Sequence, residues 1–329
     1  MIRGPRVYDG SAPLAFIFPG QGSQSIGMGL DLYERSKSAK AVFDMADEVL
    51  GINLSKTIFH GSSEELEKTV NSQPAIMVTS LACISAFKEC WDQDQCPIPM
   101  AVAGHSLGEY TSLVVSECVD FTEAINLVRE RGRLMQEASE TQPGHMAAIL
   151  GLDKKTLEDI CNIACAEIAN DNGGDQIVIS GERSCVVKAM EMASESGARR
   201  VISLPVSGAF HSSLMAPAQD GLDKAIGSAS FRDPIVPIIA NSTAKPLLTS
   251  EAVKVELSAQ LCSCVEWKRS VECMIDSGIT RFVEFGPGRV LGGLIKRIYS
   301  KGSSGDKLIE ILNVSDYESV FKTVEIIKQ

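Results

Sequence analysis

The sequence predicts an α/β fold: a core with a mainly parallel sheet, into which a smaller subdomain is inserted. Strand-like and helix-like segments alternate over most of the chain, which is typical of proteins with a parallel sheet. A serine occupies a Gly-x-Ser-x-Gly motif between an apolar strand and a helix. Between residues 144 and 207 the order becomes β-α-β-β-α-β, the ferredoxin-like arrangement. We therefore assign 14–143 and 208–329 to the core and 144–207 to the small subdomain.

The first core segment opens with a short apolar strand that runs into a polar glycine loop. Pro97 and Pro99 precede a second apolar strand, and Asp120 or Thr122 is expected to cap a long helix. The elements expected here are a strand at 14–18, helices around 38–50 and 75–90, a strand at 100–103, and helices at 107–115 and 122–139.

The inserted subdomain contains a polar stretch, Asn170 to Gly174, that is rich in turn-forming residues. We expect a turn there between two strands, and we expect Gly197 to end the second helix. The predicted elements are a strand at 146–150, a helix at 155–166, strands at 167–169 and 176–180, a helix at 183–194 and a strand at 200–206.

After residue 208 the α/β pattern of the core resumes. The segment 300–306 is expected to be a flexible linker, because it is rich in glycine and serine. Asp316 is expected to cap the terminal helix. The other elements are a strand at 235–240, a helix around 250–262, a strand at 281–285, a helix at 290–298 and a strand at 308–312.

Composition and charge exclude several classes of protein. The 329 residues are 44% hydrophobic and 22% charged, as expected of a soluble globular chain. No apolar run approaches the ~18 residues that a membrane span needs, and residues 1–13 lack the apolar centre of a secretory signal. A net charge of −11 argues against nucleic acid as a partner, so an acidic partner would need a local basic patch.

Ten cysteines are spread along the chain. Most lie among Ala, Ile and Val, as small buried residues do in a reducing compartment. There is no Cys-x-x-Cys motif, and neither Cys161/Cys165 nor Cys262/Cys264 has a histidine nearby to complete a zinc site. We therefore predict no metal site.

The strand–turn–helix context makes Ser106 a candidate nucleophile. Gly104 and Gly108 permit the tight turn and the close approach of strand and helix that such an elbow requires. The hydroxyl would lie at the start of a helix, where backbone N–H groups and the helix dipole favour a developing negative charge.

A serine nucleophile needs a base, and the chain has four histidines. His60 lies in an expected surface turn and His145 in an expected loop. His105 is held inside the elbow and points away from Ser106. His211 lies where the chain returns from the subdomain to the core, and a cleft between two such units is a natural place for a site. We select His211 as the base.

The loop Gly20-Gln21-Gly22 has a superficial similarity to a dinucleotide-binding fingerprint. The next glycine is Gly27, however, so the required spacing fails. A glycine turn at the end of a strand can instead present backbone N–H groups to an oxyanion, together with the N–H of Leu107 after the nucleophile.

Arg131 projects from the apolar stripe of its predicted helix, because Leu127, Val128, Leu134 and Met135 lie three or four residues away. A buried cation without an anionic partner is costly, so two explanations stay open. The partner is either a carboxylate of the protein, in an internal salt bridge, or a carboxylate of the substrate, held in the fork of the guanidinium.

Five motifs occur in order along the chain and together resemble one family. They are Phe18-Pro19-Gly20-Gln21-Gly22-Ser23-Gln24, Gly104-His105-Ser106-Leu107-Gly108-Glu109-Tyr110, Arg131-Gly132, Gly208-Ala209-Phe210-His211-Ser212 and Glu284-Phe285-Gly286-Pro287-Gly288. Over residues 14 to 328 the chain resembles the malonyl-CoA:acyl-carrier-protein transacylases, the loading enzymes of dissociated (type II) fatty acid synthesis. The resemblance implies a hydrolase-like α/β core with a ferredoxin-like insert, in agreement with the pattern of elements.

The resemblance also implies a role for each candidate residue. Ser106 would be the nucleophile and His211 the base. The backbone N–H groups of Gln21 and Leu107 would form the oxyanion hole. Arg131 would hold the malonyl carboxylate.

Gln260 matches the family residue whose carbonyl orients the histidine in place of an acid. The chain departs from the family pattern close to this position. Cys264 stands where the family often has proline, and Glu266 stands where it often has glutamine. The loop after Gln260 is therefore expected to differ from that of the family.

Other positions match residues that line the family's cleft or are associated with its substrate choice. Asn170 and Asn172 match asparagines that line the cleft. Leu107 and Phe210 match malonyl-selective relatives rather than methylmalonyl-selective ones.

The implied reaction has two steps. Ser106 takes the malonyl group from malonyl-CoA with release of CoA, and the phosphopantetheine thiol of acyl carrier protein then takes it from the serine. No metal or bound redox cofactor is implied, and we expect a monomer that binds neither nucleic acid nor membrane. The carrier is expected to be acidic, and two basic groups are candidates to bind it: Lys154, Lys155, Arg199 and Arg200, or Lys268, Arg269, Lys296 and Arg297.

Three other functions compete with this one. In α/β-hydrolases such as thioesterases and lipases the histidine lies near the C-terminus, whereas more than a hundred residues follow His211 here. A carrier-binding module without chemistry is disfavoured by the presence of Ser106, His211 and Arg131. A malonyl-specific acyltransferase of polyketide synthesis stays open.

The run Gln73 to Ser80 is more similar to plastid-type than to enterobacterial members of the family. Composition and the surroundings of the cysteines lead us to expect a soluble protein of a reducing compartment. That compartment is either the stroma of a plastid-type organelle or the bacterial cytoplasm.

Overall fold

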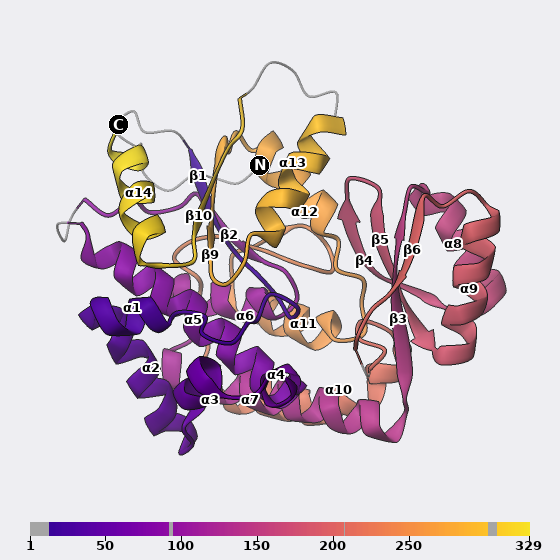
Figure 1. The fold of residues 1–329 in the computed structure, drawn as a ribbon, viewed down its shortest axis with the longest axis horizontal. Helices are drawn as coiled ribbons and strands as arrows, with labels where there is room; N and C mark the ends of the chain where they lie inside the picture. Colours follow the sequence, from indigo (N-terminus) through magenta and orange to yellow (C-terminus); the bar gives the residue numbers. More distant parts are fainter. Residues whose placement is uncertain (1–12, 92–94, 207, 302–307) are drawn as a thin grey trace.

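A computed structural model describes residues 13–91, 95–206, 208–301 and 308–329, which form two sheets (Figure 1). The large sheet has the strand order β10-β9-β1-β2-β7-β8, and the small sheet has the order β4-β5-β3-β6. In Figure 1 the small sheet stands beside the large one, at the right of the molecule. The strands of the large sheet are β1 (Leu14–Phe18), β2 (Ala101–Gly104), β7 (Ile238–Ile239), β8 (Pro246–Leu247), β9 (Arg281–Phe285) and β10 (Glu310–Val314).

β1 lies inside the large sheet, between β2 and β9, and runs parallel to both. The pairs β9–β10 and β2–β7 are also parallel, and β7–β8 is antiparallel. The prediction of a mainly parallel sheet is confirmed. Phe18 pairs with Gly104, so the glycine loop after β1 and the serine elbow after β2 leave the sheet at the same edge. This carboxyl edge is where parallel α/β sheets place their ligands.

Helices cover both faces of the large sheet. Phe16 and Phe18 of β1 pack into the main hydrophobic cluster on one face, whereas Ala15 and Ile17 pack with Trp267 on the other, because side chains alternate along a strand. The first face is covered by α2 (Lys37–Leu50), α5 (Thr69–Glu89), α6 (Leu107–Val115) and α7 (Phe121–Thr141), and the second by α12 (Trp267–Asp276) and α13 (Val290–Lys301).

One helix of the described residues, α5, is long and apolar enough to cross a membrane by length and composition alone. Within the fold, 83% of its most apolar window is buried, and α5 contacts both α2 and α7. This burial is that of a core helix. The remaining helices of the core are α1 (Leu30–Arg35), α3 (Leu54–His60), α4 (Ser63–Glu67), α10 (Ala216–Ser228), α11 (Ser250–Gln260), α14 (Tyr317–Lys328) and the 3₁₀ turn Ser213–Met215.

The small sheet has the predicted β-α-β-β-α-β order, and all its strand pairs are antiparallel. Its two helices lie on the face turned away from the large sheet (Figure 1) and enclose a separate hydrophobic cluster. The elements are β3 (Gly144–Leu150), α8 (Lys154–Ala164), β4 (Glu167–Gly173), β5 (Gln176–Glu182), α9 (Arg183–Glu195) and β6 (Arg200–Ser203). They fall within 144–207, and the predicted boundaries themselves stay a prediction.

The expected turn over Asn170–Gly174 is wrong. β4 continues to Gly173, and the hairpin closes through Gly174 and Asp175 alone, both with positive φ (58° and 72°). Two-residue hairpin loops favour this backbone because it matches the twist of the strands. The asparagines looked like turn residues because they are polar, but they are buried in a strand beside the core.

Other differences concern lengths and short elements. The strand expected at 235–240 is reduced to Ile238–Ile239, and the one expected at 200–206 ends at Ser203. His145 lies in β3 rather than in a loop. The expected linker overlaps the end of α13 at residues 300 and 301, and its part at 302–306 lies outside the described residues. The elements that the sequence pattern did not predict are α1, α3, α4, α10, α12 and β8.

Candidate active site

Ser106 is held in a strained turn between β2 and α6. Its φ of 50° and ψ of −103° are unusual for a residue with a side chain. A Cβ added at Gly104 would lie 1.8 Å from the carbonyl carbon of Gly108, and one added at Gly108 would lie 2.1 Å from the oxygen of Phe18. The close approach of strand and helix that the sequence predicted for these glycines is therefore confirmed.

His211 reaches Ser106 from the segment that returns to the core. Its Nε2 lies 2.8 Å from Ser106 Oγ, and its Nδ1 lies 3.0 Å from the backbone oxygen of Gln260 and 3.2 Å from that of Ser263. Carbonyl oxygens only accept hydrogen bonds, so Nδ1 carries the proton and Nε2 presents its lone pair to the serine hydroxyl. Burial, together with the positive charge of Arg131, lowers the pKa of His211 to about 3. The imidazole is therefore neutral at pH 7.

Arg131 is buried, 1% exposed, and lies against the same hydroxyl. One terminal nitrogen donates to Gln73 Oε1 at 2.7 Å, and the other donates to Ser106 Oγ at 3.1 Å and to Gln260 Oε1 at 3.0 Å. All these acceptors are neutral. Within the described residues no carboxylate forms an ion pair with Arg131, and its Nε has no acceptor. The internal salt bridge that the sequence left open is thus absent from this part of the chain.

The glycine loop after β1 packs directly on the elbow. A Cβ added at Gly20 would lie 2.4 Å from the oxygen of His105, so only glycine fits there. In the part of the chain that the structure describes, neither Gln21 N–H nor Leu107 N–H donates to an acceptor. Ser106 N–H, by contrast, donates to Asn241 Oδ1 at 2.7 Å. Two free donors thus flank the elbow.

β4 brings the two predicted asparagines to the core. Asn172 Oδ1 lies 2.8 Å from Nε2 of His105, the residue before the nucleophile. Asn170 forms a parallel bridge with Val265, in the loop whose carbonyls hold the histidine. Phe210, next to His211, is buried in the main hydrophobic cluster.

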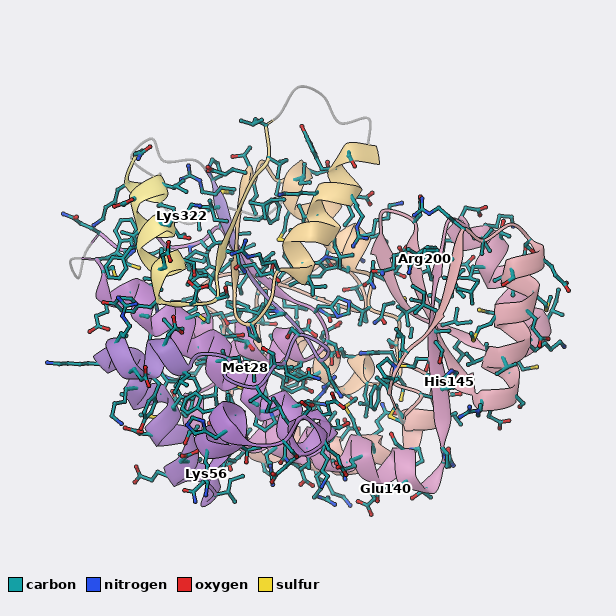
Figure 2. The ribbon with its side chains drawn as sticks, viewed as in Figure 1. Met28, Lys56, Glu140, His145, Arg200 and Lys322 are labelled. Atoms are coloured by element: carbon teal, nitrogen blue, oxygen red, sulfur yellow. The ribbon has the colours of Figure 1, made fainter. Side chains whose placement is uncertain are left out.

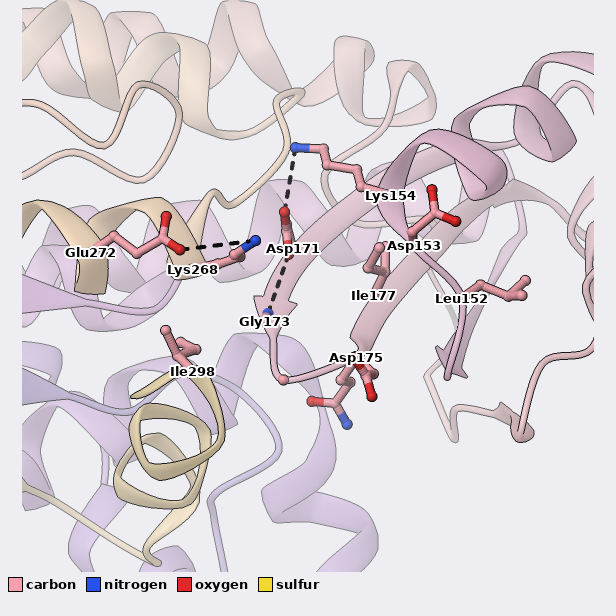
Figure 3. Close-up of a pocket in the computed structure, with 12 residues that line it drawn as sticks. Leu152, Asp153, Lys154, Asp171, Gly173, Asp175, Ile177, Lys268, Glu272 and Ile298 are labelled. Carbon is pink, nitrogen blue, oxygen red and sulfur yellow. Dashed lines mark hydrogen bonds and ion pairs between the residues drawn. The ribbon is translucent and has the colours of Figure 1, made fainter. Parts of the chain in front are cut away.

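An ion cluster also joins the small sheet to the loop after Gln260. Lys154 Nζ, at the start of α8, lies 2.8 Å from Glu266 and 3.5 Å from Asp171. Figure 3 shows the Lys154–Asp171 pair beside a cavity of about 280 Å³ between the small sheet and α12–α13. The carboxylate of Glu266 thus forms an ion pair across the junction.

Sequence reasoning missed Gln73, Asn241 and Glu109, which are all buried at the site. Asn241 followed an apolar strand directly, and polar residues at the carboxyl end of a parallel strand are common site residues, so this signal was available. Gln73 and Glu109 lie inside helices, and nothing in their spacing separates them from ordinary helix positions.

The cysteines are all free. Three are buried (Cys83, Cys118 and Cys161), Cys165 is exposed, and the other six are half-buried. Within the described residues, no group of three or more His, Cys, Asp or Glu side chains is placed to hold a metal ion.

Fold and site together define an enzyme class. A serine on a strand–helix elbow, bonded to a neutral histidine and flanked by free N–H groups, is the arrangement of enzymes that pass an acyl group through a serine ester. The acyl transferase domain family matches residues 15–320. The chain belongs to this family, among the malonyl CoA-acyl carrier protein transacylases.

Three relatives illustrate the similarity. The malonyl CoA-acyl carrier protein transacylase of Bacillus subtilis (strain 168) is 42% identical over 96% of this chain and 98% of its own length. The acyl-carrier-protein S-malonyltransferase structure from Bartonella henselae has a TM-score of 0.90 at 40% identity, covering 96% of this chain and 100% of that one. A malonyl-transacylase solved in complex with a type II PKS acyl-carrier protein has a TM-score of 0.89 at 36% identity, with the same coverage. The two organisms named are bacteria.

Proposed function

We propose that this protein transfers the malonyl group of malonyl-CoA to the phosphopantetheine thiol of acyl carrier protein, supplying type II fatty acid synthesis. The family membership supports the reaction class. The observation that carries the choice of acyl group is Arg131: a buried guanidinium, 3.1 Å from Ser106 Oγ, that has only neutral acceptors among the described residues.

The buried charge of Arg131 is a reason to expect an anionic acyl group. A buried cation without an anionic partner is destabilising. A malonyl thioester carries a carboxylate two bonds from its reacting carbonyl carbon, so it can place negative charge on the guanidinium while the carbonyl meets the hydroxyl. An acetyl group cannot do this.

In the first step Ser106 Oγ attacks the thioester carbonyl while His211 Nε2 takes its proton. The negative charge that develops on the carbonyl oxygen is stabilised by the N–H groups of Gln21 and Leu107. The C–S bond then breaks, His211 returns the proton to the departing sulfur, and free CoA leaves a malonyl-serine ester.

In the second step the carrier's thiol replaces CoA. His211 takes the thiol proton, the sulfur attacks the ester carbonyl, and the same two N–H groups stabilise the oxyanion. The C–Oγ bond breaks and Ser106 recovers its proton from His211. Neither step needs a redox change.

Docking of an acidic carrier is proposed at the two sides of the β4–β5 hairpin. A Cβ added at Gly174 would lie 2.4 Å from Arg297 Cβ, and one added at Gly151 would lie 2.8 Å from Arg199 Cβ. Gly151 N–H in turn donates to the oxygen of Asp175 in the hairpin turn. Arg199 and Arg297, one from each of the two basic groups that the sequence offered as alternatives, therefore both lie close to one hairpin. Lys154 is excluded from them, because its ammonium is paired with Glu266 and Asp171.

The polyketide alternative keeps a specific observation in its favour, because one of the similar structures holds a type II PKS carrier. Comparing kcat/KM for carriers from the two pathways distinguishes the alternatives. The predicted compartment stays a prediction.

The test of the reaction is a mass spectrum. Incubation with malonyl-CoA and no carrier should release one equivalent of CoA, stall, and leave a malonyl mass on the peptide that contains Ser106. Ser106→Ala should abolish the adduct. Continued CoA release without a carrier would indicate a thioesterase, and an adduct on a cysteine would contradict the serine assignment.

A further inference from the structure

Glu109 is a fully buried carboxylate that the reaction does not use. It lies in the first turn of α6, three residues after Ser106. One of its oxygens accepts a hydrogen bond from Asn241 N–H at 3.0 Å, and the other accepts one from the side-chain amide of Gln260. Glu109 is therefore bonded to two residues that themselves contact the site.

Asn241 holds the elbow. Its side-chain oxygen accepts from Ser106 N–H, and its side-chain nitrogen donates to the oxygen of Gly104, each at 2.7 Å. Gln260 contacts both His211 and Arg131. Its backbone oxygen faces His211 Nδ1, and its side-chain oxygen accepts from Arg131.

The amide of Gln260 lies between a group that only donates and a group that only accepts. Arg131 can only donate, so it requires the amide oxygen on its side. Ionised Glu109 can only accept, so it requires the amide nitrogen, which also donates to the oxygen of Ser106 at 3.0 Å. A single orientation satisfies both ends.

Two effects oppose each other on the charge of Glu109. Burial and the nearby charge of Glu256 raise the pKa of this carboxyl well above its ordinary value, and its hydrogen bonds and the charge of Arg131 offset only part of that rise. Both oxygens already accept from N–H groups, so a proton on either would need a further acceptor. The carboxylate is the form that matches this network.

We propose that Glu109 is a positioning residue for acyl specificity. Through the oriented amide of Gln260 it holds the Arg131 guanidinium at Ser106, ready for the carboxylate of the acyl group. This inference rests on the proposed function, because it gives Arg131 an anionic acyl group to bind.

Glu109→Gln tests the proposal because it keeps size and shape but places an amide nitrogen against a donor, either Asn241 N–H or the amide nitrogen of Gln260. In the first orientation the backbone that carries the elbow-holding Asn241 is pushed away, and in the second the Gln260 amide must turn and direct its nitrogen at Arg131. We expect the ratio of kcat/KM for malonyl-CoA to that for acetyl-CoA to fall by about tenfold or more, the scale of one misplaced buried hydrogen bond. The fall should come mainly from a higher KM for malonyl-CoA.

Glu256→Gln is the matched control. Glu256 is also a buried carboxylate and also accepts from a backbone N–H, that of Ser242, but it bonds neither Gln260 nor Arg131. Its substitution removes a charge that disfavours ionised Glu109 and leaves every hydrogen bond of the network in place, so the malonyl-to-acetyl ratio should stay within about twofold of wild type. Because both activities are measured on one preparation, any unfolded fraction cancels from the ratio.

A double variant tests whether Glu109 acts through Gln260. In a Gln260→Ala background the further change Glu109→Gln should alter the ratio no more, because the two residues act through one contact. If wild type prefers malonyl-CoA but Glu109→Gln lowers both activities by the same factor, Glu109 is merely structural and the inference is overturned. If wild type shows no preference for malonyl-CoA, the proposed function itself fails.

Discussion

The ring nitrogen Nδ1 of His211 lies 3.0 Å from the backbone oxygen of Gln260, where many serine enzymes have a carboxylate. A carbonyl fixes the tautomer of the ring as a carboxylate does, but it brings no full negative charge to raise the basicity of the imidazole. Burial and Arg131 then lower the pKa of His211 to about 3. The base is thus kept neutral over a wide range of pH.

This relationship predicts the acid side of the pH profile. The neutral imidazole is the active form, so lowering its pKa extends activity to lower pH. With acetyl-CoA, which has no carboxylate of its own to titrate, kcat/KM should stay level as pH falls through the ordinary histidine pKa of 6.5. In Arg131→Ala the positive charge is gone, the pKa of His211 rises, and the fall in kcat/KM should move to higher pH. A wild-type midpoint at 6.5 or above would contradict the geometry.

Arg131→Ala also tests acyl recognition. The loss for malonyl transfer should be about 2–5 kcal/mol, the scale measured when one partner of a buried charge pair is removed, or roughly 30-fold to a few thousand-fold in kcat/KM. Acetyl transfer should hold steady or rise.

The melting temperature of the same variant separates recognition from structure. Because Arg131 forms no direct ion pair with a carboxylate among the described residues and is linked to Glu109 only through the amide of Gln260, its removal breaks no buried salt bridge there, and the melting temperature should change little. A large fall in melting temperature, with both activities lost together, would mean that Arg131 serves the fold instead.

Much of the site could be predicted from the sequence because its residues occur in local motifs. The elbow at Ser106 needs a strand, a helix and two glycines within one short segment, and residues 100–115 showed all of these. Arg131 was visible as a charge on an apolar stripe. Asn241 and Glu109 were not found, because their importance comes from contacts between segments more than a hundred residues apart.

The misread turn at Asn170–Gly174 has the same cause. Polar residues in a strand normally face water, so a run of them favours a turn. In β4 they face another part of the protein: Asp171 meets Lys154, and Asn172 meets His105. Pairing of buried polar groups with distant residues overrides local propensity, and the sequence around β4 does not show which residues those partners are.

The Lys154–Glu266 pair should stabilise the junction between the small sheet and the histidine-holding loop. Lys154→Met leaves two carboxylates, Glu266 and Asp171, near each other without their cation. Lys154 is one-third exposed, so we expect a moderate loss of about 1–3 kcal/mol in the free energy of unfolding by urea.

Lys155→Met is the control for this change, because the neighbouring lysine is exposed and forms no ion pair in the described part of the chain. Adding Glu266→Gln to Lys154→Met should recover part of the loss. Equal stability of the Lys154 and Lys155 variants would show that the junction does not depend on the pair.

Carrier binding should depend on both sides of the β4–β5 hairpin. Arg199 and Arg200 lie at the start of β6, and Lys268 and Arg297, on α12 and α13, lie beside the hairpin glycines; all four are exposed. Unlike the ammonium of Lys154, that of Lys268 has only a long, solvent-exposed pair, 3.9 Å from Glu272. Replacing either pair by two glutamates should raise KM for an acidic carrier several-fold. This KM should also depend less on salt than that of wild type, because salt screens the attraction between opposite charges over ~10 Å at 0.1 M. Release of CoA from malonyl-CoA in the absence of carrier should not change.

The control for the docking face is a double reversal elsewhere. Lys56 and Lys322 are exposed and lie away from Arg200 in Figure 2, so Lys56→Glu with Lys322→Glu adds the same charge at a distance. A net effect of charge would raise KM equally in all three double variants, since the chain already carries −11. A local docking face would raise it in the two hairpin variants alone. If the two hairpin variants differ, with one pair silent, the carrier binds on one side of the hairpin, and the silent pair is removed from the proposed face.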